Sequence, residues 1–216
     1  MSELILGHRR MLWIVLVSAA SGVIVAWLPQ ALAVSWPVAL RDLMVTLSYF
    51  TVWSNIAVVV VTAATLAGSQ GRLASAEAKT AVAVYLTLTG SVYHLLLADL
   101  VTMEGPDVYS DYLMHSITPL LYLAYWAIFV RPQPLARSLF ARVLLMPLAF
   151  ISYWMVRGPL VNQYPYFFID LNTLSVGRVV LNSVGFALVL ELLALLFFGL
   201  SALTLRPRHT APERKA

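Results

Sequence analysis

The apolar stretch between residues 43 and 67 contains Ser48, Thr51 and Asn55, hydrogen-bonding side chains that are spaced three and four residues apart. Residues three and four apart share one face of a helix, so we expect a polar stripe on one side of this segment. Lipid offers such groups no partners, and the stripe must face other helices or a cavity. The Thr51 hydroxyl can be a nucleophile if a base removes its proton. It can equally bond to the backbone carbonyl four residues earlier.

Two histidines are candidates for that base. His115 suits a general base, because imidazoles in general titrate near neutral pH, although a histidine that caps a helix would also fit this position. Asp111 lies one helical turn before it and can orient the ring as the third member of a triad, or it can be an exposed acid of a loop. His94 is expected to be structural, with the role of base as its alternative.

Further polar groups are expected at the same end of the molecule as Thr51 and His115. Asp170 can pair with Arg178 or polarise His115, and Asn182 follows one turn later. Asn55 can donate a hydrogen bond to an oxyanion or simply join two helices. An aromatic loop, residues 164–168, precedes the last apolar run. Its side chains, among them Tyr164 and Phe167, are expected to cover the site and contact acyl chains.

One acid stands apart from this group. Glu191 lies nine residues beyond Asn182, so it faces the opposite side of the last helix. Ionisable residues inside a membrane are costly, and they are usually paired or functional. We expect a protonated or paired structural acid, with a proton or ion relay as the alternative.

The composition of the whole chain indicates a membrane protein. Of its 216 residues, 61% are hydrophobic and 11% are charged, and the mean hydropathy is +0.83. An average soluble domain is about 25% charged. The absence of cysteine excludes disulfides, thiolate metal sites and cysteine nucleophiles. The net charge of +4 follows membrane topology, so we expect no nucleic-acid partner.

Apolar runs of about 20 residues, enough to cross a bilayer, recur along the chain. They predict an all-α polytopic membrane protein with one domain of six transmembrane helices (residues 1–205). The expected spans are about 11–28, 43–67, 80–100, 112–130, 140–156 and 178–204. A basic cytoplasmic tail is expected at 206–216.

The basic residues predict the orientation of these spans. Six spans place both termini on one side of the membrane. The loops after spans one, three and five hold three of the 14 Lys and Arg residues, and the termini and remaining loops hold the other eleven. Because basic residues concentrate on the cytoplasmic side, both termini are expected in the cytoplasm. The expected location is the cell membrane, which is the inner membrane if the chain is bacterial.

Three short motifs carry a resemblance to known proteins. They are Phe-Thr-x-x-Ser-Asn at 50–55, His-x-x-x-Pro at 115–119 with the later Trp126, and Tyr-Pro-x-x-x-x-Asp at 164–170. In these the chain resembles six-span bacterial integral membrane proteins and, distantly, the androgen-induced gene and androgen-dependent TFPI-regulating protein family. That family consists of intramembrane hydrolases that cleave fatty acid esters of hydroxy fatty acids with a threonine and a histidine. The resemblance implies that Thr51 and His115 fill these roles.

Together these observations predict an intramembrane threonine hydrolase of lipid-like esters. Thr51 is the expected nucleophile and His115 the expected general base, and neither a metal nor a cofactor is required. The expected partners are membrane lipids or an acyl-ester substrate. One alternative is a small transporter or lipid-binding protein without catalysis. Another is a haem membrane protein in which His94 and His115 are the axial ligands, since both lie on the predicted outer side at similar depth.

Overall fold

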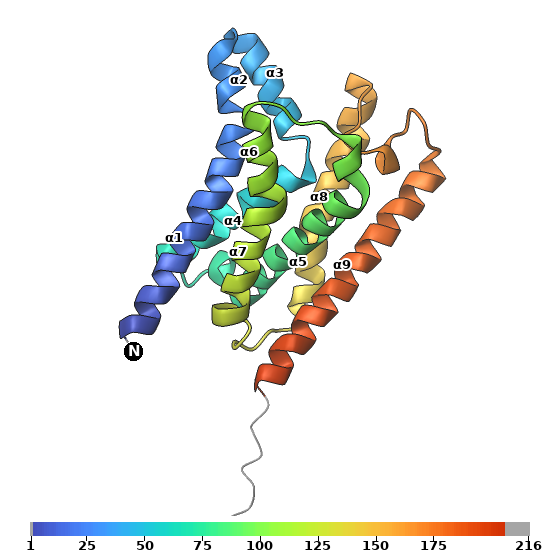
Figure 1. Cartoon of the computed structure of the whole chain (residues 1–216). Coiled ribbons are helices and arrows are strands. Elements are labelled where there is room, and N and C mark those ends of the chain that lie inside the picture. The colour runs from blue at the N-terminus through green and yellow to red at the C-terminus, as the bar shows by residue number, and fades with distance from the viewer. Residues whose placement is uncertain (1, 206–216) are drawn as a thin grey trace, which may run out of the picture.

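The computed structural model of the protein describes residues 2–205 and is an all-α polytopic bundle (Figure 1). The predicted tail at 206–216 lies outside the described residues. The helices are α1 (Ser2–Val25), α2 (Leu28–Ala33), α3 (Trp36–Thr46), α4 (Phe50–Leu66), α5 (Ala76–Val92), α6 (Pro106–Tyr112), α7 (Thr118–Tyr125), α8 (Ser138–Val161) and α9 (Val176–Leu205). Between them lie π-helical turns η2 (Tyr93–Leu97), η4 (Leu113–Ile117) and η5 (Trp126–Val130), and 3-10 turns η1 (Arg72–Ala74), η3 (Ala98–Leu100) and η6 (Phe167–Ile169).

Helix α5 occupies the centre of the bundle. It packs against α4, α7, α8 and α9, and ten of its 17 residues are buried. A helix that is buried nearly all round must lie in the interior of its fold. The start of α1 and the end of α9 lie together at one end of the bundle, which we call the proximal end (Figure 1). Helices α2 and α3 and the loop of residues 162–175 lie at the opposite, distal end.

Five of the predicted spans correspond to unbroken helical segments long and apolar enough to cross a membrane. These segments are Glu3–Val25, Ala76–Leu100, Pro106–Val130, Ser138–Val161 and Val176–Thr204. The second predicted span differs, because α3 and α4 meet at 88° instead of forming one rod across 43–67. Thr51 therefore lies in the first turn of α4 and not in the middle of a long helix.

Two indole side chains, one from α4 itself and one from α8, pair with the backbone carbonyls at this break. The Nε1–H group of Trp53 donates to the Leu47 carbonyl (2.7 Å), and that of Trp154 donates to the Ser48 carbonyl (3.1 Å). Within a continuous helix, backbone N–H groups four residues later would satisfy both carbonyls. Buried backbone groups must be paired, so the two indoles supply what the interrupted helix no longer provides.

The π-helical turn η4 has a local cause. Pro119 has no N–H group to donate to the His115 carbonyl, and its ring would clash with that carbonyl in a regular helix. The turn widens instead, and the Thr118 N–H donates to the Leu113 carbonyl five residues earlier. The displaced His115 carbonyl approaches α5 at Gly90, where a Cβ atom would lie 3.2 Å from it. A glycine thus permits the close contact that sets His115 against the centre of the bundle.

Candidate active site

The Thr51 hydroxyl lies beside the imidazole of His115. Its Oγ1 atom is 3.1 Å from the His115 Nε2 atom, and Thr51 is only 7% exposed. The two residues come from α4 and η4, which are 64 positions apart in the chain. The separation is within the hydrogen-bonding range that a nucleophile and its general base require.

Thr51 differs in this from most other hydroxyl groups of the transmembrane helices. Those of Thr62, Thr80, Thr87 and Thr89 each donate to the carbonyl four residues earlier. Such bonds occupy the hydroxyl proton and leave nothing for a base to remove. Because the chain bends before α4, Thr51 has no helical carbonyl at the corresponding position, and its hydroxyl bonds to an imidazole instead.

Two further side chains fix the His115 ring. Its Nδ1 atom is 2.9 Å from Oδ1 of Asp111, and the Tyr93 hydroxyl donates to Oδ2 of the same carboxylate at 2.6 Å. A carboxylate only accepts hydrogen bonds, so Nδ1 of His115 carries a proton, and in the neutral form of the imidazole Nε2 is then the acceptor toward Thr51. The Tyr93 ring also stacks on the imidazole, with centroids 3.8 Å apart and planes 10° apart.

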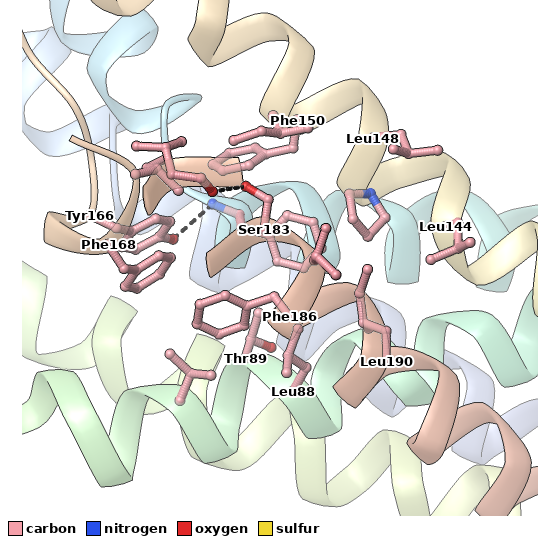
Figure 2. A pocket seen from close by; sticks show the side chains of 18 of the residues that line it. Leu88, Thr89, Leu144, Leu148, Phe150, Tyr166, Phe168, Ser183, Phe186 and Leu190 are labelled. Atoms are coloured by element: carbon pink, nitrogen blue, oxygen red, sulfur yellow. Dashed lines mark hydrogen bonds between the residues drawn. The ribbon is translucent and has the colours of Figure 1, made fainter. Parts of the chain in front are cut away.

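Thr51 lies at the wall of a large apolar pocket. The pocket has a volume of about 360 Å³ and is enclosed by α4, α5, α8, α9 and the loop between the last two (Figure 2). Of the other hydroxyls that line it, those of Thr89 and Ser183 donate to carbonyls of their own helices. Leu148, Val180 and Val184 line the pocket and are themselves at least half exposed. The pocket therefore opens laterally between α8 and α9.

Tyr166 brings a hydroxyl from the distal loop to the same place. Its phenol oxygen accepts the N–H of Phe50, the first residue of α4, at 3.0 Å (Figure 2). Burial raises the pKa of Tyr166 to about 12, although hydrogen bonds to Phe50 and Thr51 act against it. The phenol therefore stays protonated at physiological pH and can donate its proton to a ligand. The Phe168 ring stacks on Tyr166, with centroids 5.0 Å apart, and also lines the pocket.

Asn55 and Ser48, the other members of the predicted polar stripe, have structural contacts. The Asn55 side-chain N–H₂ donates to the carbonyls of Thr51 and Met114 and so joins α4 to η4. It does not line the pocket, so an oxyanion there is out of its reach. The Ser48 hydroxyl donates to Met44 and lies in the break before α4. Only Thr51 of these three residues faces the pocket.

His94 lies beside the site without joining it. Its Nε2 atom is 3.1 Å from the Ser116 hydroxyl, its ring meets Tyr93 edge-on, and it is exposed. His115 bonds to Asp111 and Thr51 through its two nitrogens, so this geometry favours acid–base chemistry over the bis-histidine haem alternative.

The residues expected around the loop have different partners from those predicted. Asp170 accepts the backbone N–H of Asn172 and stabilises a turn, and among the described residues it forms no ion pair with Arg178. Arg178 is exposed at the start of α9. Asn182 donates to the Phe168 carbonyl at 2.8 Å and thereby anchors the loop over the pocket.

Within the aromatic loop, Tyr164 and Phe167 are not the residues that cover the site. The Tyr164 ring packs so closely on Gly158 that a Cβ atom there would clash with it, and Phe167 is 57% exposed. Neither lines the pocket, whereas Tyr166 and Phe168 do. Phe167 begins the 3-10 turn η6 and points outward.

Glu191 lies midway along α9, one turn beyond Ala187, a pocket residue. Among the described residues it has no hydrogen-bond or ion-pair partner, and it does not line the pocket. It is partly exposed, and it does not belong to the pocket at Thr51.

Sequence reasoning missed Tyr93, and it did not single out Tyr166 within the loop of residues 164–168. Tyr166 belongs to the aromatic loop, and strict alternation along that loop would have placed it on the same face as Tyr164. Tyr93 precedes His94, and nothing in its local sequence connects it with Asp111, 18 residues later. Its contact follows from how η2 and α6 pack.

No family model matches this chain, and no curated protein or solved structure is significantly similar to it. The likeness to the androgen-induced gene family therefore rests on its three short motifs, and any functional assignment depends on the geometry of the site.

Proposed function

We propose that the protein is an intramembrane hydrolase of lipid-like esters, with Thr51 as nucleophile and His115 as general base. The observation that carries the proposal is the hydrogen-bonded chain from Thr51 through His115 to Asp111, at the wall of an apolar pocket. Nucleophile, base and orienting carboxylate are the three parts of a hydrolytic triad, which is recognised by geometry and not by position in the sequence.

In the proposed reaction, the Thr51 Oγ1 atom attacks the ester carbonyl carbon while its proton passes to His115 Nε2. Asp111 holds the Nδ1 proton and stabilises the imidazolium that forms. His115 then protonates the departing alcohol oxygen, and the acyl group remains on Thr51. A water molecule gives a proton to His115 and attacks this acyl ester. The carboxylic acid leaves, and the proton returns to Thr51.

The carbonyl oxygen gains negative charge during each attack, and Tyr166 is the proposed donor to it. Its oxygen accepts the Phe50 N–H and it also hydrogen-bonds to Thr51, so its phenol O–H group lies beside the hydroxyl that would attack the carbonyl. Thr51 lies in the first turn of α4, where aligned peptide dipoles also favour negative charge. Donors fixed in advance in a site of low dielectric are among the largest contributions to catalysis.

The pocket supports an ester with a long acyl chain as substrate. Its walls are almost entirely hydrocarbon and aromatic, and its lateral opening lies between two lipid-facing helices. A substrate dissolved in the membrane can then reach Thr51 without crossing water. Burial of each methylene contributes about 0.8 kcal/mol, so an acyl chain supplies binding energy remote from the reacting carbonyl.

The proposal is tested by hydrolysis of a long-chain 4-nitrophenyl ester with purified protein in detergent. Thr51→Val keeps the shape of the side chain but removes the hydroxyl, and we expect no turnover from it. Thr51→Ser keeps a hydroxyl and should retain activity. Equal turnover by the wild type and Thr51→Val would refute the nucleophile. A wild type that binds such esters without cleaving them would favour the lipid-binding protein or transporter, which the open apolar pocket also suits.

For the orientation, we propose that the proximal end, where α1 begins and α9 ends, is cytoplasmic, because most basic residues of the described part of the chain lie there. The site then faces the outer half of the cell membrane. A membrane-impermeant thiol reagent applied to intact cells should label Gly105→Cys and not Gly71→Cys. Labelling of Gly71→Cys alone would reverse the orientation.

A further inference from the structure

A second apolar groove lies on another side of α4, between α4 and α8. Its volume is about 490 Å³, and it shares no lining residue with the pocket at Thr51. It is lined by Leu47, Trp53, Ile56, Ala57, Val60, Val61, Leu73, Met146 and Tyr153. Val60 and Leu73 are 40% and 55% exposed, so the groove is open on the side where lipid chains lie in a membrane.

One cation stands at the distal end of this groove. The Arg157 guanidinium lies 5.8 Å from the centre of the Tyr153 ring and 4.9 Å from that of Trp154. Its Nη1 atom donates to the Ser48 hydroxyl at 2.8 Å, next to the groove residue Leu47. The guanidinium is therefore fixed in place at the point where the groove reaches the distal surface.

No carboxylate in residues 2–205 balances the charge of Arg157. Among the described residues, no acidic oxygen lies within 4.0 Å of its nitrogens, and its Nε–H is buried without a hydrogen-bond partner. Arg142, on the same helix, has by contrast Glu77 and Ser75 as partners. A partly desolvated cation with an unused donor is costly unless an anion from outside the chain pairs with it.

We propose that this groove binds a membrane phospholipid, with its phosphodiester on Arg157 and one acyl chain along α4. A guanidinium matches two phosphate oxygens with paired N–H groups, and in Arg157 the Ser48 hydroxyl engages only Nη1. From Trp53 to Val61 the groove follows α4 for about 12 Å, at 1.5 Å per residue. The groove thus has a charged group at the distal surface and apolar walls toward the centre of the membrane. A phospholipid has the same order of polar headgroup and apolar chain. The site is separate from the proposed catalytic pocket and does not depend on its activity.

Native mass spectrometry with dioleoyl phosphatidylglycerol, titrated into the detergent-solubilised protein, tests the charge. We expect Arg157→Gln to bind this lipid about tenfold more weakly than the wild type, the equivalent of one charged hydrogen bond. Arg178→Gln removes an exposed arginine from the same end of the bundle and should bind as the wild type does. Equal binding by Arg157→Gln and the wild type would overturn the proposal.

A second variant tests the acyl chain without touching the charge. Val60→Phe places a ring in the groove, far from Arg157, and should weaken binding of the same lipid while its thermal unfolding stays unchanged. Unchanged affinity in Val60→Phe would overturn the acyl part of the site. Inorganic phosphate should not displace the lipid at concentrations that leave the protein folded. Displacement by phosphate would identify a simple anion site and contradict the lipid assignment.

Discussion

The Thr51 hydroxyl lies 3.1 Å from the Nε2 atom of His115, although this threonine is surrounded in sequence by residues that favour an ordinary membrane helix. The relationship depends on the break before α4. The Leu47 carbonyl, which would otherwise accept from Thr51, instead accepts from the Trp53 indole. The proposed reactivity of the hydroxyl therefore depends on the break in the backbone, and on the side chains that maintain it, as well as on His115.

Asp111→Asn should lower ester hydrolysis by about 10²–10⁴-fold, since the amide can hold the imidazole in the wrong tautomer. A Tyr93→Phe variant loses only the hydrogen bond to the same carboxylate and should show a smaller loss. Both rates are measured at saturating ester over a range of pH. Full activity in Asp111→Asn would show that this carboxylate does not orient the base.

Tyr166→Phe should reduce kcat by about 10²–10³-fold and change KM little, because an oxyanion donor acts mainly in the transition state. Tyr164→Phe is the matched control, since Tyr164 belongs to the same loop but does not line the pocket. The two variants are compared in steady-state hydrolysis of one long-chain ester. A loss confined to KM would assign Tyr166 to substrate binding or loop closure.

Trp154→Phe should destabilise the bundle. It leaves the Ser48 carbonyl without its indole donor, and an unpaired buried carbonyl costs about 1–3 kcal/mol. The expected result is a lower unfolding temperature in detergent, together with reduced hydrolysis as the break relaxes. Trp13→Phe replaces a tryptophan that is 52% exposed and should change neither quantity. An unaltered unfolding temperature in Trp154→Phe would show that the indole is not needed to hold the break.

Ala187→Phe should shift hydrolysis toward shorter acyl chains. Ala187 lines the pocket, and each methylene that the new ring excludes forfeits about 0.8 kcal/mol of binding. Val189→Phe adds the same ring to α9 at a residue that does not line the pocket, and its chain-length profile should match the wild type. The profiles come from kcat/KM values for a series of saturated esters. Identical profiles for both variants would place the acyl chain elsewhere.

The helical membrane architecture could be predicted from the sequence because it follows from local composition. Apolar runs of the right length define five of the spans without reference to any tertiary contact. The break between α3 and α4 could not be predicted in this way. No proline or glycine marks residues 47–49, and the Ser48 carbonyl is paired by the Trp154 indole, which only the folded bundle brings close.

The site shows a similar division. The residue types at Thr51 and His115, with Asp111 one turn earlier, were sufficient to suggest a nucleophile, a base and an orienting acid. The sequence did not predict that α4 and η4 are neighbours. It also left alternative partners open for Asn55 and Asp170. Tyr93 and Tyr166 joined the site through packing between segments far apart in the chain. Such contacts depend on which helix faces meet, and periodicity does not determine that.

The most direct test of the central claim is covalent labelling of the intact protein with a hydrophobic fluorophosphonate, followed by peptide mass spectrometry. The hydrolase account predicts one adduct, on Thr51, which forms steeply more slowly in His115→Ala and at a nearly normal rate in His94→Ala. Thr51→Val should remain unlabelled while unfolding at the same temperature as the wild type. Labelling that persists in the folded Thr51→Val variant, or an adduct on another residue, would contradict the assignment of Thr51 as nucleophile.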